Sequence, residues 1–155
     1  MKKTLLFVLA LIASGCADAR QSALCEGLSE GSPLEDVRTC AEQGYAPAQV
    51  QLGYVYARGD GVPEDDAEAV RWYRLAAEQG YAIAQNNLGF MYRDGYGVPE
   101  DHVLAYMWYN LAAAQGHERA QRNKDNIEEQ MTREQIAEAQ RLSTEWLEAH
   151  PPDGN

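Results

Sequence analysis

The chain has 155 residues, of which 24% are charged, and a formal net charge of −11. This length is enough for one domain with a sizeable hydrophobic core. Its acidic surface should repel nucleic acid and the headgroups of anionic lipids, so we expect no nucleic-acid partner. Any electrostatic preference should favour a basic protein or peptide.

Residues 1–15 have the features of an export signal. Two lysines follow the initial methionine, and an apolar run then extends from Leu5 to Ala13. This run is much shorter than the roughly 20 residues that a helix needs to cross a bilayer, and small residues follow it. The segment is therefore predicted to be a lipoprotein-type signal peptide and takes no part in the fold.

Two cleavage sites are compatible with this signal. The segment Ala13-Ser14-Gly15-Cys16 resembles the bacterial lipobox, with Ala13 where that motif usually carries leucine. The resemblance implies a lipidated Cys16, membrane contact only through the lipid anchor, and an outer-membrane lipoprotein that faces the periplasm. Alternatively, cleavage after Ala19, at an A-x-A sequence, would remove Cys16 and release a soluble periplasmic protein.

Residues 20–44 are predicted to form an N-terminal capping helical hairpin. Because Cys16 is either lipidated or removed, either cleavage leaves two cysteines available for pairing, Cys25 and Cys40, and such a pair is expected to form a disulfide in an oxidising periplasm. Closing a loop of about 15 residues would stabilise the fold by about 3 kcal/mol; the alternative is two buried free thiols. Ser32 and Glu35 have the spacing of a capping box for the second helix of this hairpin, with a proline at its first position.

The central part of the chain is an internal repeat. Residues 41–76 and 77–112 are identical at 22 of 36 aligned positions, and a period of this length is typical of units that bury their apolar faces against each other. In each unit, apolar residues spaced by four predict a first helix, glycines predict a loop, and an aspartate predicts the cap of a second helix. In the first copy, Asp65 and Glu68 have the spacing of a full capping box. The spaced apolar residues of that copy are Ala48, Leu52 and Tyr56.

The pattern shared by the two copies is AQxxLGxxYxxGxGVxxD followed by AxxWYxxAAxQG. It closely resembles the Sel1-like repeat (SLR), a relative of the tetratricopeptide repeat. The resemblance implies an all-α fold, an α/α right-handed superhelix with N- and C-terminal capping helices, and two full repeats at residues 45–80 and 81–116. Proteins of this kind typically act as adaptors, regulators or inhibitors that hold another protein.

Residues 117–150 are predicted to form a partial third repeat and a C-terminal capping helix. The repeat pattern stops where Lys124 and Asp125 replace the core leucine and the packing glycine. Thr132 begins a capping box for a last helix, which should cover the end of the solenoid. Residues 151–155 are expected to be a disordered tail. The apolar stripe of the last helix consists of Ile136, Ala139, Leu142, Trp146 and Leu147.

Signals for catalysis or metal binding are weak. Residues 27–31 match the G-x-S-x-G pattern around Ser29, but a nucleophile elbow needs a turn between a strand and a helix, and no strand pattern is present. The histidines lack zinc-ligand spacing, and His102 and His117 are expected at the surface or at helix caps. We predict a protein that is not an enzyme and has no cofactor and no metal site. A hydrolase that uses Ser29 or an acidic pair is the remaining alternative.

The variable outer face of the two first helices is the candidate binding surface. With about 100° per residue, its residues lie opposite the buried stripe, and the resemblance implies that first helices line a concave groove. Tyr54 and Phe90 are the best anchors because aromatic side chains supply a large contact area; alternatively, both pack on neighbouring first helices. The full predicted set is Val50, Gln51, Tyr54, Arg58, Asn86, Asn87, Phe90, Arg93 and Asp94.

Together these features predict a protein–protein interaction module without enzymatic activity. It would be an adaptor or regulator in the bacterial cell envelope that holds a protein or peptide on its concave face. The alternative is an immunity or inhibitor protein directed against a toxic enzyme that acts on the envelope. Both functions would use the same surface, so gene neighbourhood rather than the residues would separate them.

Overall fold

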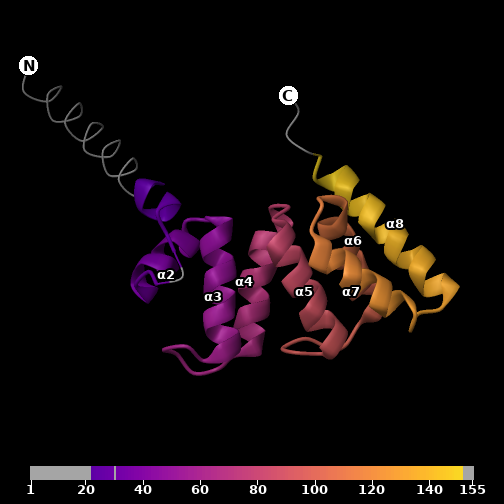
Figure 1. Cartoon of the computed structure of the whole chain (residues 1–155), viewed down its shortest axis with the longest axis horizontal. Coiled ribbons are helices and arrows are strands. Elements are labelled where there is room, and N and C mark those ends of the chain that lie inside the picture. The colour runs from indigo at the N-terminus through magenta and orange to yellow at the C-terminus, as the bar shows by residue number, and fades with distance from the viewer. Residues whose placement is uncertain (1–21, 30, 152–155) are drawn as a thin grey trace, which may run out of the picture.

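The computed structural model describes residues 22–29 and 31–151. The predicted signal peptide, the lipidation at Cys16 and all but one residue of the predicted tail lie outside these ranges. Every element in the described ranges is a helix, and the helices follow one another in an elongated row (Figure 1), so the predicted all-α class is confirmed. None of these helices is both long and apolar enough to cross a membrane. After a helical stretch at residues 22–26, the elements are α2 (Leu34–Glu42), α3 (Ala46–Arg58), α4 (Asp66–Glu78), α5 (Ala82–Asp94), α6 (His102–Ala114), α7 (Glu118–Glu128) and α8 (Arg133–Ala149).

The loops between α3 and α4 and between α5 and α6 begin and end in the same way. Gly59 and Gly95 end the first helices with φ of 68° and 70°, a left-handed conformation that residues with a Cβ atom rarely adopt. The carboxylates of Asp65 and Asp101 then each accept a 2.9 Å hydrogen bond from the N–H group three residues further on. The structure therefore contains both predicted aspartate caps.

The second bond of the predicted capping box is absent, because other groups bind the atoms involved. The N–H group of Asp65 donates to the carbonyl oxygen of Tyr56 at 2.9 Å, and that of Asp101 makes the equivalent bond at 2.8 Å. The Glu68 carboxylate instead accepts hydrogen bonds of 2.6–3.0 Å from Arg71. These bonds lower the pKa of Glu68. The cap does not need this glutamate, which explains why the second repeat carries leucine there.

The capping box predicted at the start of α2 does not form. The hydroxyl oxygen of Ser32 accepts a hydrogen bond from the N–H group of Ser29 at 2.9 Å, and no side chain caps the helix. Pro33 is the residue before the helix rather than its first residue. The prediction was wrong because the spacing of a serine and a glutamate cannot reveal a competing turn upstream.

Within each repeat, a glycine lets the two helices approach closely. A Cβ atom at Gly53 would lie 2.4 Å from Cε1 of Tyr73, and one at Gly89 would lie 2.8 Å from the ring of Tyr109. Both tyrosine rings are buried. Interiors packed this densely have no room for the extra methyl group, so the glycine of the repeat pattern is required by the facing ring.

Buried glutamines connect each repeat to its neighbours. Gln49 Nε2 donates to the carbonyl oxygen of Ala41 at 3.1 Å, and Gln79 Nε2 donates to Gln49 Oε1 at 2.8 Å. Gln85 makes the same two bonds one repeat later, at 3.3 and 2.8 Å. A buried amide needs partners for both its oxygen and its nitrogen. These bonds therefore fix how α2, α3 and α4, and then α4, α5 and α6, stack on one another.

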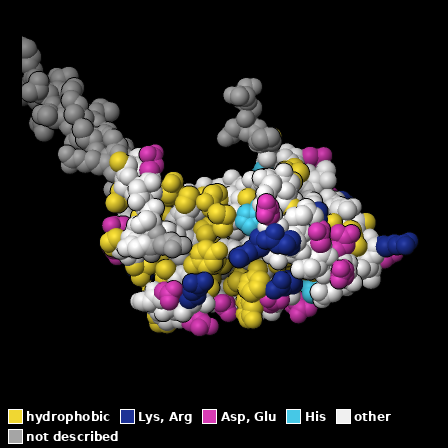
Figure 2. Space-filling view, viewed as in Figure 1, with side chains coloured by type: hydrophobic (Ala, Val, Ile, Leu, Met, Phe, Trp, Pro, Cys, Tyr) yellow, Lys and Arg dark blue, Asp and Glu magenta, His cyan; other side chains and the backbone are white. Residues whose placement is uncertain are grey.

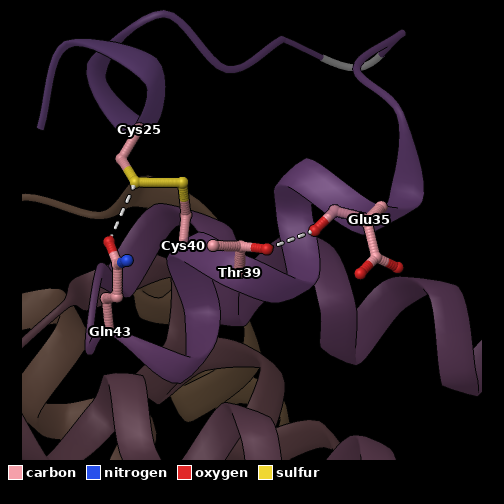
Figure 3. Close-up of a disulfide and its surroundings, with 5 residues drawn as sticks. All are labelled: Cys25, Glu35, Thr39, Cys40 and Gln43. Carbon is pink, nitrogen blue, oxygen red and sulfur yellow. Dashed lines mark hydrogen bonds between the residues drawn. A yellow bond between two sulfur atoms is a disulfide. The ribbon is translucent and has the colours of Figure 1, made fainter. Parts of the chain in front are cut away.

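A disulfide joins the N-terminal segment to α2 (Figure 3). Cys25 and Cys40 are bonded, with Cα atoms 5.5 Å apart, and both side chains are buried in a cluster with Leu52 and Trp72. The predicted bond is thus present, and the alternative of two free thiols is not. Gln43 Oε1 lies 3.7 Å from Cys25 Sγ; because a disulfide sulfur has no hydrogen to donate, this is a packing contact.

The last helix does not continue the repeat. In place of pairing with α7 as α4 pairs with α3, α8 packs against α6 (Figure 1). Its Trp146 meets the edge of Trp108 with ring centroids 6.1 Å apart and reaches Gly80, beyond the end of α4. The helix therefore covers part of the second repeat as well as the end of the solenoid.

The capping box predicted at the start of α8 is present, but only part of the predicted apolar stripe is correct. Thr132 and Gln135 form both bonds of the predicted capping box, at 3.2 and 2.9 Å. Leu147 is 47% exposed, so its place in the stripe was predicted wrongly. Ser143 is buried instead, and its hydroxyl donates to a carbonyl oxygen one turn earlier.

Candidate protein-binding surface

Two aromatic side chains are exposed at equivalent positions of the first helices. Tyr54 on α3 is 37% exposed and Phe90 on α5 is 39% exposed. A second ring orients each of them, because Tyr54 meets Tyr73 edge-on and Phe90 stacks on Tyr96, both with centroids 5.7 Å apart. The two rings therefore combine a free surface with a fixed orientation.

An arginine lies over each of these rings. Arg58 Cζ is 5.7 Å from the ring centroid of Tyr54, and Arg93 Cζ is 4.9 Å from that of Phe90, within the range of cation–π attraction. Arg93 is half-buried and donates two hydrogen bonds, of 2.7 and 2.6 Å, to the exposed Asp94, which raise its pKa. Arg58 is exposed and has no ion-pair partner among the residues that the structure describes. The surface thus carries an uncompensated positive charge at Tyr54 and a neutral pair at Phe90.

Three residues of the predicted binding set are buried beneath this surface. Val50 is 5% exposed, Asn86 4% and Asn87 9%, so their side chains offer a partner almost no contact area. Asn86 Oδ1 accepts a 2.9 Å hydrogen bond from Asn123 on α7, and Asn87 Oδ1 accepts a 3.4 Å bond from the Tyr54 hydroxyl. Helical periodicity did not reveal that neighbouring elements cover these positions, and the prediction is corrected to that extent.

Sequence reasoning also missed two residues of this region. Tyr96, 46% exposed, supports Phe90 from the loop position that Asp60 holds in the first repeat. Asn123 occupies in the third copy the position of Gln51, which is half-buried, and of Asn87. Applying the 36-residue period to the loop and to the incomplete third copy would have pointed to both.

The residues considered for catalysis or metal binding belong to different elements. Ser29 is exposed and follows a helical stretch rather than a strand. Nδ1 of His117 accepts a 3.1 Å hydrogen bond from the N–H group of Ala120 and so caps α7, while His102 is the first residue of α6. The described ranges hold no group of three His, Cys, Asp or Glu side chains suited to a metal ion.

Charge is unevenly distributed over the surface. Figure 2 shows hydrophobic side chains gathered over the half of the molecule formed by α2–α4, basic side chains across the middle, and many of the acidic ones near the edges. The net charge of −11 therefore does not describe each part of the surface. Local groups, such as the exposed Arg58 and the Arg93–Asp94 pair, decide which charges a partner would meet on contact.

Comparison with known proteins identifies the repeat. A sequence model of the Sel1 repeat matches residues 46–81 and 82–117, each beginning one residue after the predicted boundary. The chain matches no curated protein.

Two solved structures resemble the chain. A Sel1 repeat protein from Oxalobacter formigenes is 43% identical, with a TM-score of 0.58, and the match covers 59% of this chain and 69% of that one. A protective antigen of uropathogenic Escherichia coli strains that displays an SLR fold is 35% identical, with a TM-score of 0.72. That match covers 74% of this chain but only 25% of the antigen. Sel1 repeats generally form scaffolds that bind other proteins rather than catalytic sites. From its repeats and these two structures, the chain belongs to the Sel1 repeat family.

Proposed function

We propose that the protein is an adaptor or regulator without enzymatic activity that binds a protein or peptide on the face formed by α3 and α5. This face would be the concave side of the superhelix. One observation carries the proposal: Tyr54 and Phe90 recur at the same repeat position and are both more than one third exposed. In a repeat protein, equivalent exposed positions form a regularly spaced row that an extended partner can follow.

The physical state of these rings favours binding. Aromatic side chains supply a large contact area and have only two rotatable bonds, so little entropy is lost when they are immobilised. Here the supporting rings and the overlying arginines already restrict them before a partner arrives. Preorganisation of this kind raises affinity because it lowers the cost of ordering the interface.

Charge has different consequences for approach and for contact. Counted from Cys16, the chain has 11 basic and 24 acidic residues, which gives −13. A field of this sign would speed the approach of a basic partner. At the surface itself, Arg58 is uncompensated while Arg93 is paired with Asp94. The partner should therefore be basic overall but place a carbonyl, carboxylate or aromatic group near Arg58.

The cell envelope is the proposed location. A basic, apolar start to the chain and a pair of cysteines joined by a disulfide both support export into an oxidising compartment. The lipobox-like segment supports an acylated Cys16 and an outer-membrane lipoprotein. Mass spectrometry of the membrane fraction should find an acylated Cys16 at the N-terminus. A free Arg20 N-terminus in the soluble fraction would instead indicate a soluble periplasmic protein.

A pull-down from periplasmic extract tests the proposed surface. The double variant Tyr54→Ala/Phe90→Ala should lose a partner that the unaltered protein recovers, because truncating central aromatic anchors typically costs more than 1 kcal/mol each. Leu147→Ala is a matched control, because Leu147 is similarly exposed but lies on α8. Equal recovery of the same partner by the double variant and the control would reject the α3–α5 face.

A further inference from the structure

A groove open to solvent lies between α2 and α4, the second helices that precede and follow α3. Its volume is about 600 Å³, and its walls include Ala41, Gln49, Trp72 and Leu75. Leu75 is 37% exposed, so part of a large apolar side chain is open to solvent in this groove. We call this site the α2–α4 groove.

The same groove occurs one repeat later, between α4 and α6, where it is filled. Trp146 of α8 lies 3.9 Å from the position of a Cβ atom at Gly80 and against the edge of Trp108. Together with Leu142, it packs on a cluster that contains Leu111. Leu111 is 2% exposed, although it is the repeat equivalent of the exposed leucine in the α2–α4 groove. The molecule thus shows what fits such a groove: a helix with two large apolar side chains four residues apart.

The two grooves are nearly identical in composition. Of the nine residues that line the α2–α4 groove, seven recur unchanged 36 residues further on. The exceptions are Arg71, where the filled groove has Met107, and Glu78, where it has Ala114. The guanidinium of Arg71 is bound to Glu68 and its Cζ lies 4.1 Å from the centroid of the adjacent tryptophan ring, so its charge is compensated.

The remaining difference makes the α2–α4 groove more acidic than its counterpart. Glu42 and Glu78 are both exposed members of its lining. Within the described ranges, neither forms an ion pair. An occupant that satisfies this groove therefore combines the apolar pair of α8 with basic residues.

We propose that the α2–α4 groove binds an amphipathic helix of a partner protein. This helix carries leucine and tryptophan, or residues of similar size, four positions apart, followed by lysine or arginine. The occupant comes from another protein, because Leu142 and Trp146 of this chain already pack on the second repeat, and those of a second copy do the same. The inference goes beyond the proposed function, since it uses none of the residues of the α3–α5 face.

Two labelled peptides probe the groove in the full chain by fluorescence anisotropy. The native peptide has the sequence of residues 133–150. The basic peptide is the same except for Glu148→Lys and His150→Lys, which leave the ion pairs of Arg141 with Glu138 and Glu145 intact. Both peptides are also made with Trp146→Ala, and all carry the same helix-stabilising side-chain staple on the face away from Leu142 and Trp146.

The basic peptide should bind several-fold more tightly than the native peptide, and added salt should reduce the difference. The Trp146→Ala peptides should bind at least about tenfold more weakly, as expected for loss of a central aromatic anchor. In the protein, Leu75→Lys should weaken binding of both peptides by at least about tenfold. Glu78→Ala reproduces the filled groove at that position and should remove the preference for the basic peptide. These two side chains are exposed, so neither change should affect folding, which circular dichroism checks.

Phe90→Ala is the matched control on the α3–α5 face and should leave peptide binding unchanged. Loss of peptide binding in this variant would move the site to that face and overturn the α2–α4 assignment. Absence of saturable binding of any peptide, or binding that Leu75→Lys leaves intact, would also overturn it. Self-association that Leu75→Lys abolishes would show that a second copy is the occupant and would overturn the assignment to a partner protein.

Discussion

The two repeats at residues 41–76 and 77–112 share their internal contacts but differ in what surrounds them. Both have the same glutamine bonds, aspartate caps and glycine–tyrosine contacts. However, the groove next to Leu75 is open, while its equivalent at Leu111 is covered by α8. The comparison teaches that identical residues determine how the helices pack within the solenoid, whereas the neighbours of each repeat determine which surfaces stay exposed.

The largest expected difference between the repeats is at the loop glycines. A Cβ atom at Gly97 would lie 2.4 Å from the backbone of Asp66, whereas one at the equivalent Gly61 would meet nothing within 4 Å. Both have positive φ, which alone costs about 1 kcal/mol for alanine. The added clash should make Gly97→Ala lose about 3 kcal/mol of unfolding free energy, against about 1 kcal/mol for Gly61→Ala. Urea unfolding measures both, and equal losses would show that this loop does not pack on α4.

Truncating Trp146, which fills the groove between α4 and α6, should make the surroundings of the two repeats more alike. Trp146→Ala should lower the unfolding free energy by about 2 kcal/mol, less than for a fully buried tryptophan because this one is only partly covered. Leu147→Ala, on the exposed side of α8, should stay within about 0.5 kcal/mol. A loss no larger than that of the control would mean that α8 does not stabilise the second repeat.

Alkaline pH should destabilise both repeats through their buried tyrosines. Burial raises the pKa of Tyr109 from 10.0 to about 12, and burial also raises the pKa of Tyr73. Because these pKa values are higher in the folded than in the unfolded state, the contribution of the neutral tyrosines is complete below pH 10 and is lost as the pH rises towards the folded pKa. We expect a loss of about 2 kcal/mol between pH 10 and 12 from Tyr109, to which the ionisation of Tyr73 adds.

A phenylalanine variant isolates the contribution of Tyr109 to this alkaline loss. Tyr109→Phe should reduce the alkaline loss without lowering stability at pH 7, because the Tyr109 hydroxyl is buried with no hydrogen-bond partner in the part of the chain that the structure describes. Tyr96→Phe is the control, because that ring is 46% exposed. An unchanged pH profile in Tyr109→Phe would contradict the assignment to this residue.

The smallest expected effects test the contacts that the repeats share. Gln79→Ala and Gln115→Ala each remove a 2.8 Å hydrogen bond to a buried glutamine. Each should cost about 1 kcal/mol, because the amide oxygen left behind loses its partner. Equal losses in thermal unfolding would support equivalent stacking, and losses that differ by more than about 0.5 kcal/mol would show that the neighbours also affect these contacts.

Helix ends were predictable because they depend on residues close in the chain. The left-handed glycines at Gly59 and Gly95 and the caps at Asp65 and Asp101 follow from local geometry, and the repeat itself made the all-α superhelix predictable. The box at Ser32 failed because a turn just upstream competes for the same hydroxyl. Short sequence patterns therefore predict a helix end only where no neighbouring turn competes for the same groups.

The binding surface was only partly predictable because it depends on contacts between distant segments. Helical periodicity placed Tyr54 and Phe90 outward, but it also placed Asn86 there, which a bond from α7 helps to bury. Neither the helical nor the 36-residue periodicity shows that α8 departs from the repeat geometry and that its Trp146 packs against the second repeat. The α2–α4 groove therefore became visible only once the path of the last helix was known.

The glutamine bonds have a consequence for how this molecule can change length. Each bond joins residues whose separation is the same in both units, so excising residues 46–81 would bring Gln85 to the carbonyl of Ala41 that Gln49 occupies now. The shortened solenoid would keep its terminal capping helices and the way its repeats stack. A chain with one inserted unit would keep both as well. Duplication or loss of one repeat in the gene would thus change the length of the protein without breaking the glutamine bonds between adjacent repeats.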